Sequence, residues 1–193
     1  MARFAIIGYG SLIWDLDNLA PYVEGEWDMY QGPHLPLEFS LISKKRKRAL
    51  ALAIDHVDGL SCPTCVITSR RHLLEHAVID LARREHTAKH QIGFFDRVSG
   101  TGHSRSSTTL RTVQDWLNRS MFDGVVWTDG ERNFESLTGH AFSLQAALEH
   151  LRELTGESLA EARRYIHNTP QRVDTPLRRA LANSHWWHHA ADD

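Results

Sequence analysis

The 193-residue sequence predicts an α+β protein, with a small mixed β-sheet or barrel flanked by helices. The N-terminal half consists mainly of short apolar runs of strand length, each bounded by turn residues. The last third instead repeats apolar residues at helical spacing, between capping residues. Strands followed by helices are typical of an α+β arrangement. At this length we expect one domain, residues 1–193, with a helical C-terminal extension from about 141.

Four apolar runs mark the strands of the N-terminal half. Residues 3–8 end at a glycine turn, and residues 65–68 form another short run. Residues 37–43 and 48–55 flank the charged stretch "KKRKR", so they predict a hairpin. The basic run 44–48 is then expected to be a solvated turn whose charges discourage edge pairing, rather than a localisation or nucleic-acid signal.

The first helix is predicted over 69–90, capped by Ser69. After it we expect a strand over 91–98, a small polar loop over 99–109 that lies over a site, a helix near 110–121 and a strand over 123–129. Three further helices are predicted: 143–156, ending at Gly156; 158–169, capped by Ser158; and 175–187, opened by Thr175 and Pro176. Trp186 and Trp187, in "HWWHH", are expected to anchor the tail.

Glu85 is unusual because it continues the apolar stripe of the predicted helix. At 100° per residue, it lies about 20° from Leu74, between Val78 and Leu81. It also falls in the last turns of the helix, where the helix dipole disfavours a negative charge. Two explanations remain open. A partner such as a neighbouring arginine neutralises Glu85, or Glu85 is a catalytic carboxylate in a cleft, with a raised pKa.

Two short patterns offer alternative chemistry. "HLLEH" contains His72, Glu75 and His76 in the H-x-x-E-H spacing of zinc peptidases, but both histidines project opposite the apolar stripe, towards solvent. A zinc hydrolase is therefore the weakest alternative. Cys62 and Cys65 form a C-x-x-C pair before an apparent strand, which favours a structural pair over redox chemistry.

Composition excludes several classes of partner. The net charge of −2 gives no general electrostatic support for binding nucleic acid. No apolar run approaches the roughly 20 residues of a membrane span, and we expect neither a membrane partner nor a secretory signal. Two cysteines suit a reducing compartment, so a cytoplasmic location is predicted. The oligomeric state is left open.

The loop "GYGSL" carries the most specific signal. It lacks the G-x-S-x-G pattern of a serine nucleophile, and Ile13 stands where a dinucleotide-binding loop has its third glycine. "FAIIGYGSLIW" (4–14) resembles the first strand and loop of the gamma-glutamylcyclotransferase-like superfamily, particularly its ChaC-type members. "LARREHT" (81–87) resembles their L-D-x-R-E segment, with Ala82 in place of the aspartate, and it aligns their catalytic glutamate with Glu85.

The resemblance implies both a fold and a reaction. The fold would be gamma-glutamylcyclotransferase-like, and the enzyme would cyclise a small gamma-glutamyl amide or peptide to 5-oxoproline without a metal or other cofactor. Glu85 would be the general acid/base. The substrate-binding loop would comprise Gly8, Tyr9, Gly10, Ser11 and Leu12, with backbone N–H groups directed at a carboxylate or oxyanion. The alternative is a non-catalytic protein that binds a small ligand in the same pocket.

Overall fold

The computed structural model describes residues 2–189 and has a mixed α+β fold, which confirms the predicted class. As far as they are described, residues 1–35 and 63–130 form one compact unit, here called unit 1. Residues 36–62 and 131–193 form a second, unit 2. A single domain over 1–193 stays a prediction.

Unit 1 contains a six-stranded sheet in the order β2-β6-β1-β9-β7-β8. Its central strand β1 pairs antiparallel with β6 and parallel with β9, so the sheet is mixed. All of β1 is buried, as expected for a continuous apolar run. The strands are β1 (Phe4–Gly8), β2 (Val23–Asp28), β6 (Cys65–Ser69), β7 (Ile92–Asp96), β8 (Thr101–His103) and β9 (Gly124–Thr128).

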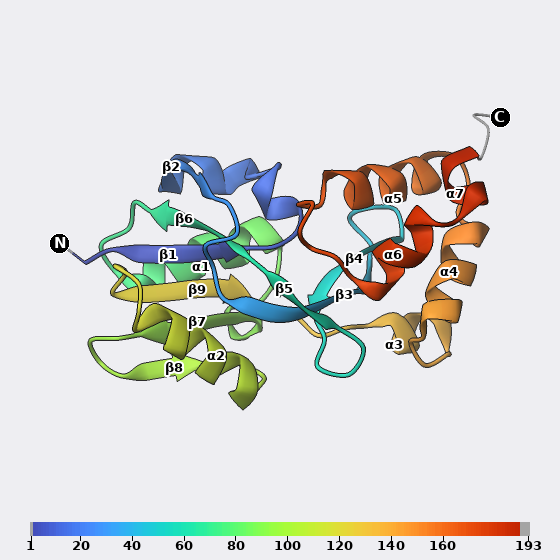
Figure 1. Cartoon of the computed structure of the whole chain (residues 1–193). Coiled ribbons are helices and arrows are strands. Elements are labelled where there is room, and N and C mark those ends of the chain that lie inside the picture. Colours follow the sequence, from blue (N-terminus) through green and yellow to red (C-terminus); the bar gives the residue numbers. More distant parts are fainter. Residues whose placement is uncertain (1, 190–193) are drawn as a thin grey trace. The chain divides into compact units, whose positions relative to one another are not determined.

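Two α-helices accompany this sheet, with α1 (Leu74–Glu85) behind it and α2 (Ser107–Leu117) in front of it in Figure 1. Helix α1 packs on β1, β7 and β9. It begins later than predicted because Ser69 belongs to β6, where it pairs with Phe4. Much of the predicted 99–109 loop is also ordered secondary structure, as β8 and the start of α2. Three 3-10 helices complete the unit: η1 (Ser11–Ile13), η2 (Asp17–Tyr22) and η3 (Lys89–Gln91).

Unit 2 holds most of a three-stranded sheet, β4-β3-β5, and the C-terminal helices. Its strands are β3 (His34–Ser43), β4 (Ala49–Ile54) and β5 (Leu60–Pro63). The helices are α3 (Phe134–Thr138), α4 (Leu144–Glu153), α5 (Gly156–Asn168), α6 (Pro176–Ala182) and α7 (His185–His189). The predicted hairpin is confirmed by the antiparallel pairing of β3 and β4.

The boundaries of the C-terminal helices correct the prediction in three places. Ser158, the predicted cap of the 158–169 helix, lies inside α5, whose N-cap is Thr155. Gly156 opens α5 instead of ending α4, because Leu154 already has an extended backbone at the end of α4. The predicted 175–187 helix is interrupted after α6, whose start is nevertheless as expected: Thr175 accepts a hydrogen bond from the Arg178 N–H, and Pro176 follows the cap. Trp186 and Trp187 lie on α7 and pack edge to face.

The basic run at residues 44–48 forms the turn between β3 and β4, but it is not simply solvated. Arg46 is buried, and its guanidinium lies 2.8 Å from Glu161 of α5 and over the ring of Tyr165. Lys47 pairs with Glu157. The predicted turn is confirmed, but the expectation that it is solvated is wrong for Arg46, because Glu161 of a later helix pairs with its buried guanidinium. Within residues 2–189, no helix combines the length and the apolar character needed to cross a membrane.

Candidate functional site

The glycine loop begins where β1 ends, at the carboxyl ends of the parallel strands β1 and β9. The phenolic O–H of Tyr9 donates to the carbonyl of Thr128 at 2.8 Å, so the loop is attached to the end of β9. The first hydrogen bond inside the following 3-10 turn runs from the Ile13 N–H to the Gly10 carbonyl, at 3.0 Å. The N–H groups of Ser11 and Leu12 come before this first bond, so they donate no hydrogen bond within the turn.

Two residues of the loop are fixed by packing. A Cβ atom at Gly8 would lie 2.6 Å from the Cη2 atom of Trp27, so the ring of Trp27 requires glycine at this position. Leu12 is buried in the core cluster with Ile6, Leu81 and Ala82. Because its side chain is committed to the core, Leu12 can contribute to a ligand site only through its backbone.

Helix α1 ends directly after Glu85. His86 has the left-handed conformation, with φ 52° and ψ 44°. The Thr87 N–H donates to the Ala82 carbonyl at 3.0 Å, and the His86 N–H donates to the Arg83 carbonyl at 3.2 Å. This pattern of a left-handed cap with bonds back to the last turn stops the helix. The predicted helix to residue 90 is therefore too long, and Glu85 is the last residue of α1.

Arg84 connects the end of α1 to the glycine loop. Its side chain is only 3% exposed. The Nη1 atom donates to Glu85 Oε1 at 2.8 Å, and the Nη2 atom donates to Ser11 Oγ at 3.3 Å and to the Asp15 carbonyl at 2.5 Å. The buried Nε atom has no hydrogen-bond partner among the described residues. One guanidinium thus holds together Glu85 and Ser11, which are separated by more than 70 positions in the sequence.

Glu85 itself lies at the margin of the buried face of α1, with 21% of its side chain exposed. Its burial is less complete than the helical projection predicts, because Arg84 occupies the fully buried position beside it. Arg84 is thus the neighbouring arginine that was expected to neutralise Glu85. This pairing does not exclude a catalytic role for Glu85, since a carboxylate held by one arginine still has lone pairs available for a proton or a ligand.

Asp129 is a second carboxylate at this end of the sheet, directly after β9. It is 1% exposed, and its Oδ2 atom accepts bonds from Ser104 Oγ at 2.9 Å and the Arg105 N–H at 2.7 Å. Arg105 also binds the carbonyls of Asp129 and Gly130. Asp129 therefore holds the segment between β8 and α2 in place, and this segment includes part of the loop that was expected over a site.

Two hollows lie beside α1. One, of about 450 Å³, has an apolar floor of Leu74, Val78 and Phe94 between α1, β7 and β8. The other, of about 620 Å³, lies around His86 at the end of α1. Neither Glu85 nor any residue of the 8–12 loop lines these two hollows. They are thus separate from the Arg84-centred contacts.

The alternative motifs do not form reactive groups in the structure. His72 precedes α1, so it does not share a helix face with His76, and both are exposed. Among residues 2–189, no group of three or more His, Cys, Asp and Glu side chains is placed to hold a metal ion. Cys62 and Cys65 are both free and buried, and burial raises the pKa of each thiol. Raised thiol pKa values oppose nucleophilic reactivity.

Sequence reasoning named Glu85 and the loop as candidates and a neighbouring arginine as one partner for Glu85, but it did not predict that this arginine also contacts Ser11 and the Asp15 carbonyl. An arginine adjacent to a suspected catalytic glutamate gives no hydrophobic signal, and the helical projection concerned apolar positions only. Comparisons with protein-family models, with curated proteins and with solved structures gave no match to this chain.

Proposed function

We propose that this protein is a gamma-glutamylcyclotransferase-like enzyme, in fold and in activity, that converts a small gamma-glutamyl amide or peptide into 5-oxoproline and a free amine. The observation that carries the proposal is the Arg84 guanidinium, which bonds Glu85 on one side and Ser11 of the glycine loop on the other. A candidate proton acceptor and a candidate oxyanion cradle thereby share one rigid, buried connection.

The reaction is an intramolecular acyl transfer. The α-amine of the substrate attacks its own γ-carbonyl carbon, a C–N bond forms to close the five-membered ring, and the original amide C–N bond breaks. The α-ammonium loses two protons overall and the leaving nitrogen gains two, so one carboxylate can relay them. Glu85 has this role in the proposal, first as general base and then as general acid.

Developing negative charge on the γ-carbonyl oxygen needs donors that are already in place. The N–H groups of Ser11 and Leu12, which the 3-10 turn leaves unused, supply two such donors. Tyr9 fixes the loop by its bond to Thr128 rather than by contacting the substrate through its hydroxyl. Because the attack is intramolecular, much of the rate gain comes from holding a reactive conformer between these groups.

Asp129 is less suited than Glu85 to carry a proton during the reaction. Its Oδ2 atom already accepts two hydrogen bonds that organise the neighbouring segment, so protonating it would disturb the fold. Glu85 is held by one residue and is partly exposed, so it can exchange a proton. A non-catalytic protein that binds a small ligand at the same loop is the second candidate.

The experiment is incubation of the purified protein with gamma-glutamyl dipeptides and gamma-glutamyl alkylamines, with 5-oxoproline detected by mass spectrometry. The proposal expects turnover of at least one member of the panel, unaffected by a metal chelator. Saturable binding of these compounds with no 5-oxoproline would favour the ligand-binding protein. Release of 5-oxoproline that a chelator abolishes would contradict the metal-independent reaction proposed for Glu85.

A further inference from the structure

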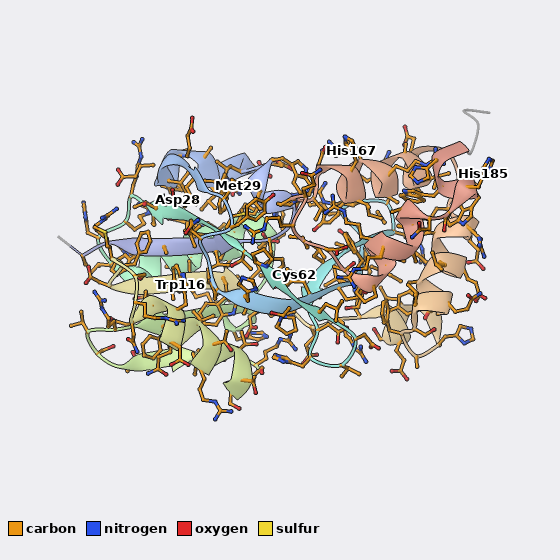
Figure 2. The ribbon with its side chains drawn as sticks, viewed as in Figure 1. Asp28, Met29, Cys62, Trp116, His167 and His185 are labelled. Carbon is orange, nitrogen blue, oxygen red and sulfur yellow. The ribbon has the colours of Figure 1, made fainter. Side chains whose placement is uncertain are left out.

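The hollow of about 450 Å³ beside α1 belongs to unit 1 and is lined by residues of α1, η3, β7 and β8. It lies on the face of the sheet that α1 covers. The other face carries α2, whose Trp116 is labelled in Figure 2. An apolar cavity of about 150 Å³ is enough for a benzene ring, so this hollow has room for a bicyclic ring.

Two apolar walls line this hollow. Leu74 and Val78 are four positions apart on α1, so they share one helix face, and both pack in the core cluster. Phe94 of β7 and His103 of β8 are direct partners in the sheet, and their rings lie 6.3 Å apart at an angle of 35°. The helix thus provides an aliphatic wall and the β7–β8 hairpin an aromatic one, and a flat ring between them can contact both.

The acidic and basic side chains of the described lining already have partners in the fold. Glu75 pairs with Lys89 at 3.6 Å, and both side chains are mostly exposed, so this pair lies at the mouth of the hollow. Asp96 accepts hydrogen bonds at 2.9 Å from the Val98 N–H and from the Ser99 hydroxyl, and it thereby organises the turn between β7 and β8. Because these groups serve the fold, the lining favours an uncharged ligand over an ion.

His103 adds a hydrogen-bond acceptor whose tautomer is fixed by its neighbour. Its Nε2 atom lies 2.9 Å from the carbonyl oxygen of His90. A carbonyl can only accept, so Nε2 carries the proton and donates, and Nδ1 of the neutral ring keeps a lone pair. Among the described residues, the ring makes its only hydrogen bond through Nε2. An uncharged ligand that reaches this ring therefore needs a donor, such as an aromatic N–H.

We propose that this hollow, the α1–β8 pocket, binds an uncharged, planar bicyclic aromatic compound with one N–H donor, of which indole is the simplest example. The ring lies between the aliphatic and the aromatic wall, and its N–H donates to Nδ1 of His103. Apolar walls with a few positioned polar groups are the arrangement expected of a small-molecule site. Glu85 does not line the pocket, and the proposal is independent of the reaction assigned to that residue.

Indole is the probe for this proposal, and benzofuran is its matched control, because it has the same shape with an oxygen in place of the N–H. Two-dimensional amide NMR of the isotope-labelled full chain measures the affinity and locates the site. We expect indole to bind with a Kd below about 1 mM and to shift the amide signals of Phe94 and His103. Benzofuran is expected to bind at least about threefold more weakly, because it cannot donate to His103. Absence of binding, shifts confined to other parts of the chain, or equal affinities for the two compounds would overturn the proposal.

One pair of variants tests the hydrogen bond. His103→Phe keeps an aromatic ring beside Phe94 but removes the acceptor, so indole is expected to bind no more tightly than benzofuran. His76→Phe changes an exposed histidine of α1 that does not line the pocket, and it is expected to keep the preference of the wild type for indole. A His103→Phe protein that still prefers indole would contradict the assigned acceptor.

A second pair tests the aliphatic wall. Leu74→Lys places a charge in the lining and is expected to weaken indole binding at least about tenfold. Leu73→Lys changes the preceding leucine, which is exposed and does not line the pocket, and it is expected to alter the affinity less than about twofold. Circular dichroism checks that each variant folds, and the His103→Phe test does not depend on the folding of Leu74→Lys. Equal effects of the changes at 73 and 74 would contradict the pocket.

Discussion

The guanidinium of Arg84, almost fully buried, donates a 2.8 Å hydrogen bond to the carboxylate of its neighbour Glu85. The two residues are consecutive, yet they differ in environment: Arg84 is inside the protein and Glu85 is at its margin. The left-handed turn at His86 permits this difference, because the helix stops there and the final side chain is not forced onto the packed face.

The first prediction concerns this arginine. Arg84→Lys keeps a positive charge but cannot contact Glu85, Ser11 and the Asp15 carbonyl at once, because an ammonium lacks the planar fork of a guanidinium. We expect the free energy of unfolding to fall by about 1–3 kcal/mol. If Arg84 positions the catalytic groups, kcat falls by about 10–100-fold while KM changes little.

Steady-state kinetics and urea unfolding of the same preparations measure both effects. Arg83→Lys is the control, because Arg83 lies on the same turn of α1 and does not contact the glycine loop in the described structure. A loss of stability with unchanged kcat would limit Arg84 to a structural role. Equal effects at 83 and 84 would show that the bridge to Ser11 is unimportant.

Gly8 provides the second prediction. In Gly8→Ala the added methyl group would approach the Cη2 and Cζ3 atoms of Trp27 to 2.6 and 2.7 Å, so the ring must move. We expect a loss of about 1–3 kcal/mol in the free energy of unfolding. Gly130→Ala is the control, because a Cβ atom at Gly130 has no heavy atom within 4 Å in the described structure. Thermal unfolding compares the two, and equal stability of both variants would contradict the packing described for Trp27.

Asp55 in unit 2 gives a prediction about pH. Burial alone would raise the pKa of this carboxyl, but the N–H groups of Asp58 and Val57 and the Arg132 guanidinium bond its charged form, and the net result is a pKa below the usual 3.8. A lowered folded-state pKa stabilises the fold above pH 3.8, and this stabilisation is lost as the pH falls through the folded-state value.

Asp55→Asn is therefore expected to destabilise the protein by about 1–3 kcal/mol at pH 7, with a smaller difference from the wild type as the pH drops below about 4. Asp58→Asn is the matched control, since Asp58 contacts the same Arg132 but is 32% exposed, against 1% for Asp55. Denaturant unfolding at several pH values follows the difference. A difference that stays constant down to pH 2 would show that ionisation of Asp55 does not contribute.

Much of the fold could be predicted because local patterns and tertiary packing agree. Strand β1 is apolar throughout and buried throughout, and Thr175 with Pro176 opens α6 as their residue types favour. Strand β2 was missed because its sequence, "VEGEWD", is largely exposed and has no apolar periodicity. The start of α1 was placed too early because Ser69, a plausible cap, instead pairs in the sheet, which only the tertiary fold decides.

Part of the candidate site could also be predicted, because some of its residues carry local signals in the sequence. Glycine at position 8 and an acid on an apolar stripe are local signals, and both were visible in the sequence. A neighbouring arginine was also one expected partner of Glu85. The contact of Arg84 with Ser11 was not visible, because it forms only when the tertiary fold brings η1 to the end of α1. Likewise, the burial of Arg46 depends on Glu161, which lies 115 positions later in the chain.

The proposal that Glu85 is the general base is tested most directly by Glu85→Gln. Glutamine keeps an oxygen that can accept the bond from Arg84, so we expect folding to be retained, while the residue can no longer carry a proton. Glu75→Gln is the control, since Glu75 is an exposed acid in the first turn of the same helix.

The decisive measurement is the rate of 5-oxoproline release from a gamma-glutamyl amide by the wild type and these two variants, with circular dichroism as the check on folding. We predict that Glu85→Gln lowers kcat at least about 100-fold, within the range of general acid–base catalysis, and that Glu75→Gln retains wild-type turnover. A folded Glu85→Gln protein that releases 5-oxoproline at the wild-type rate would contradict the assignment of Glu85 as the base.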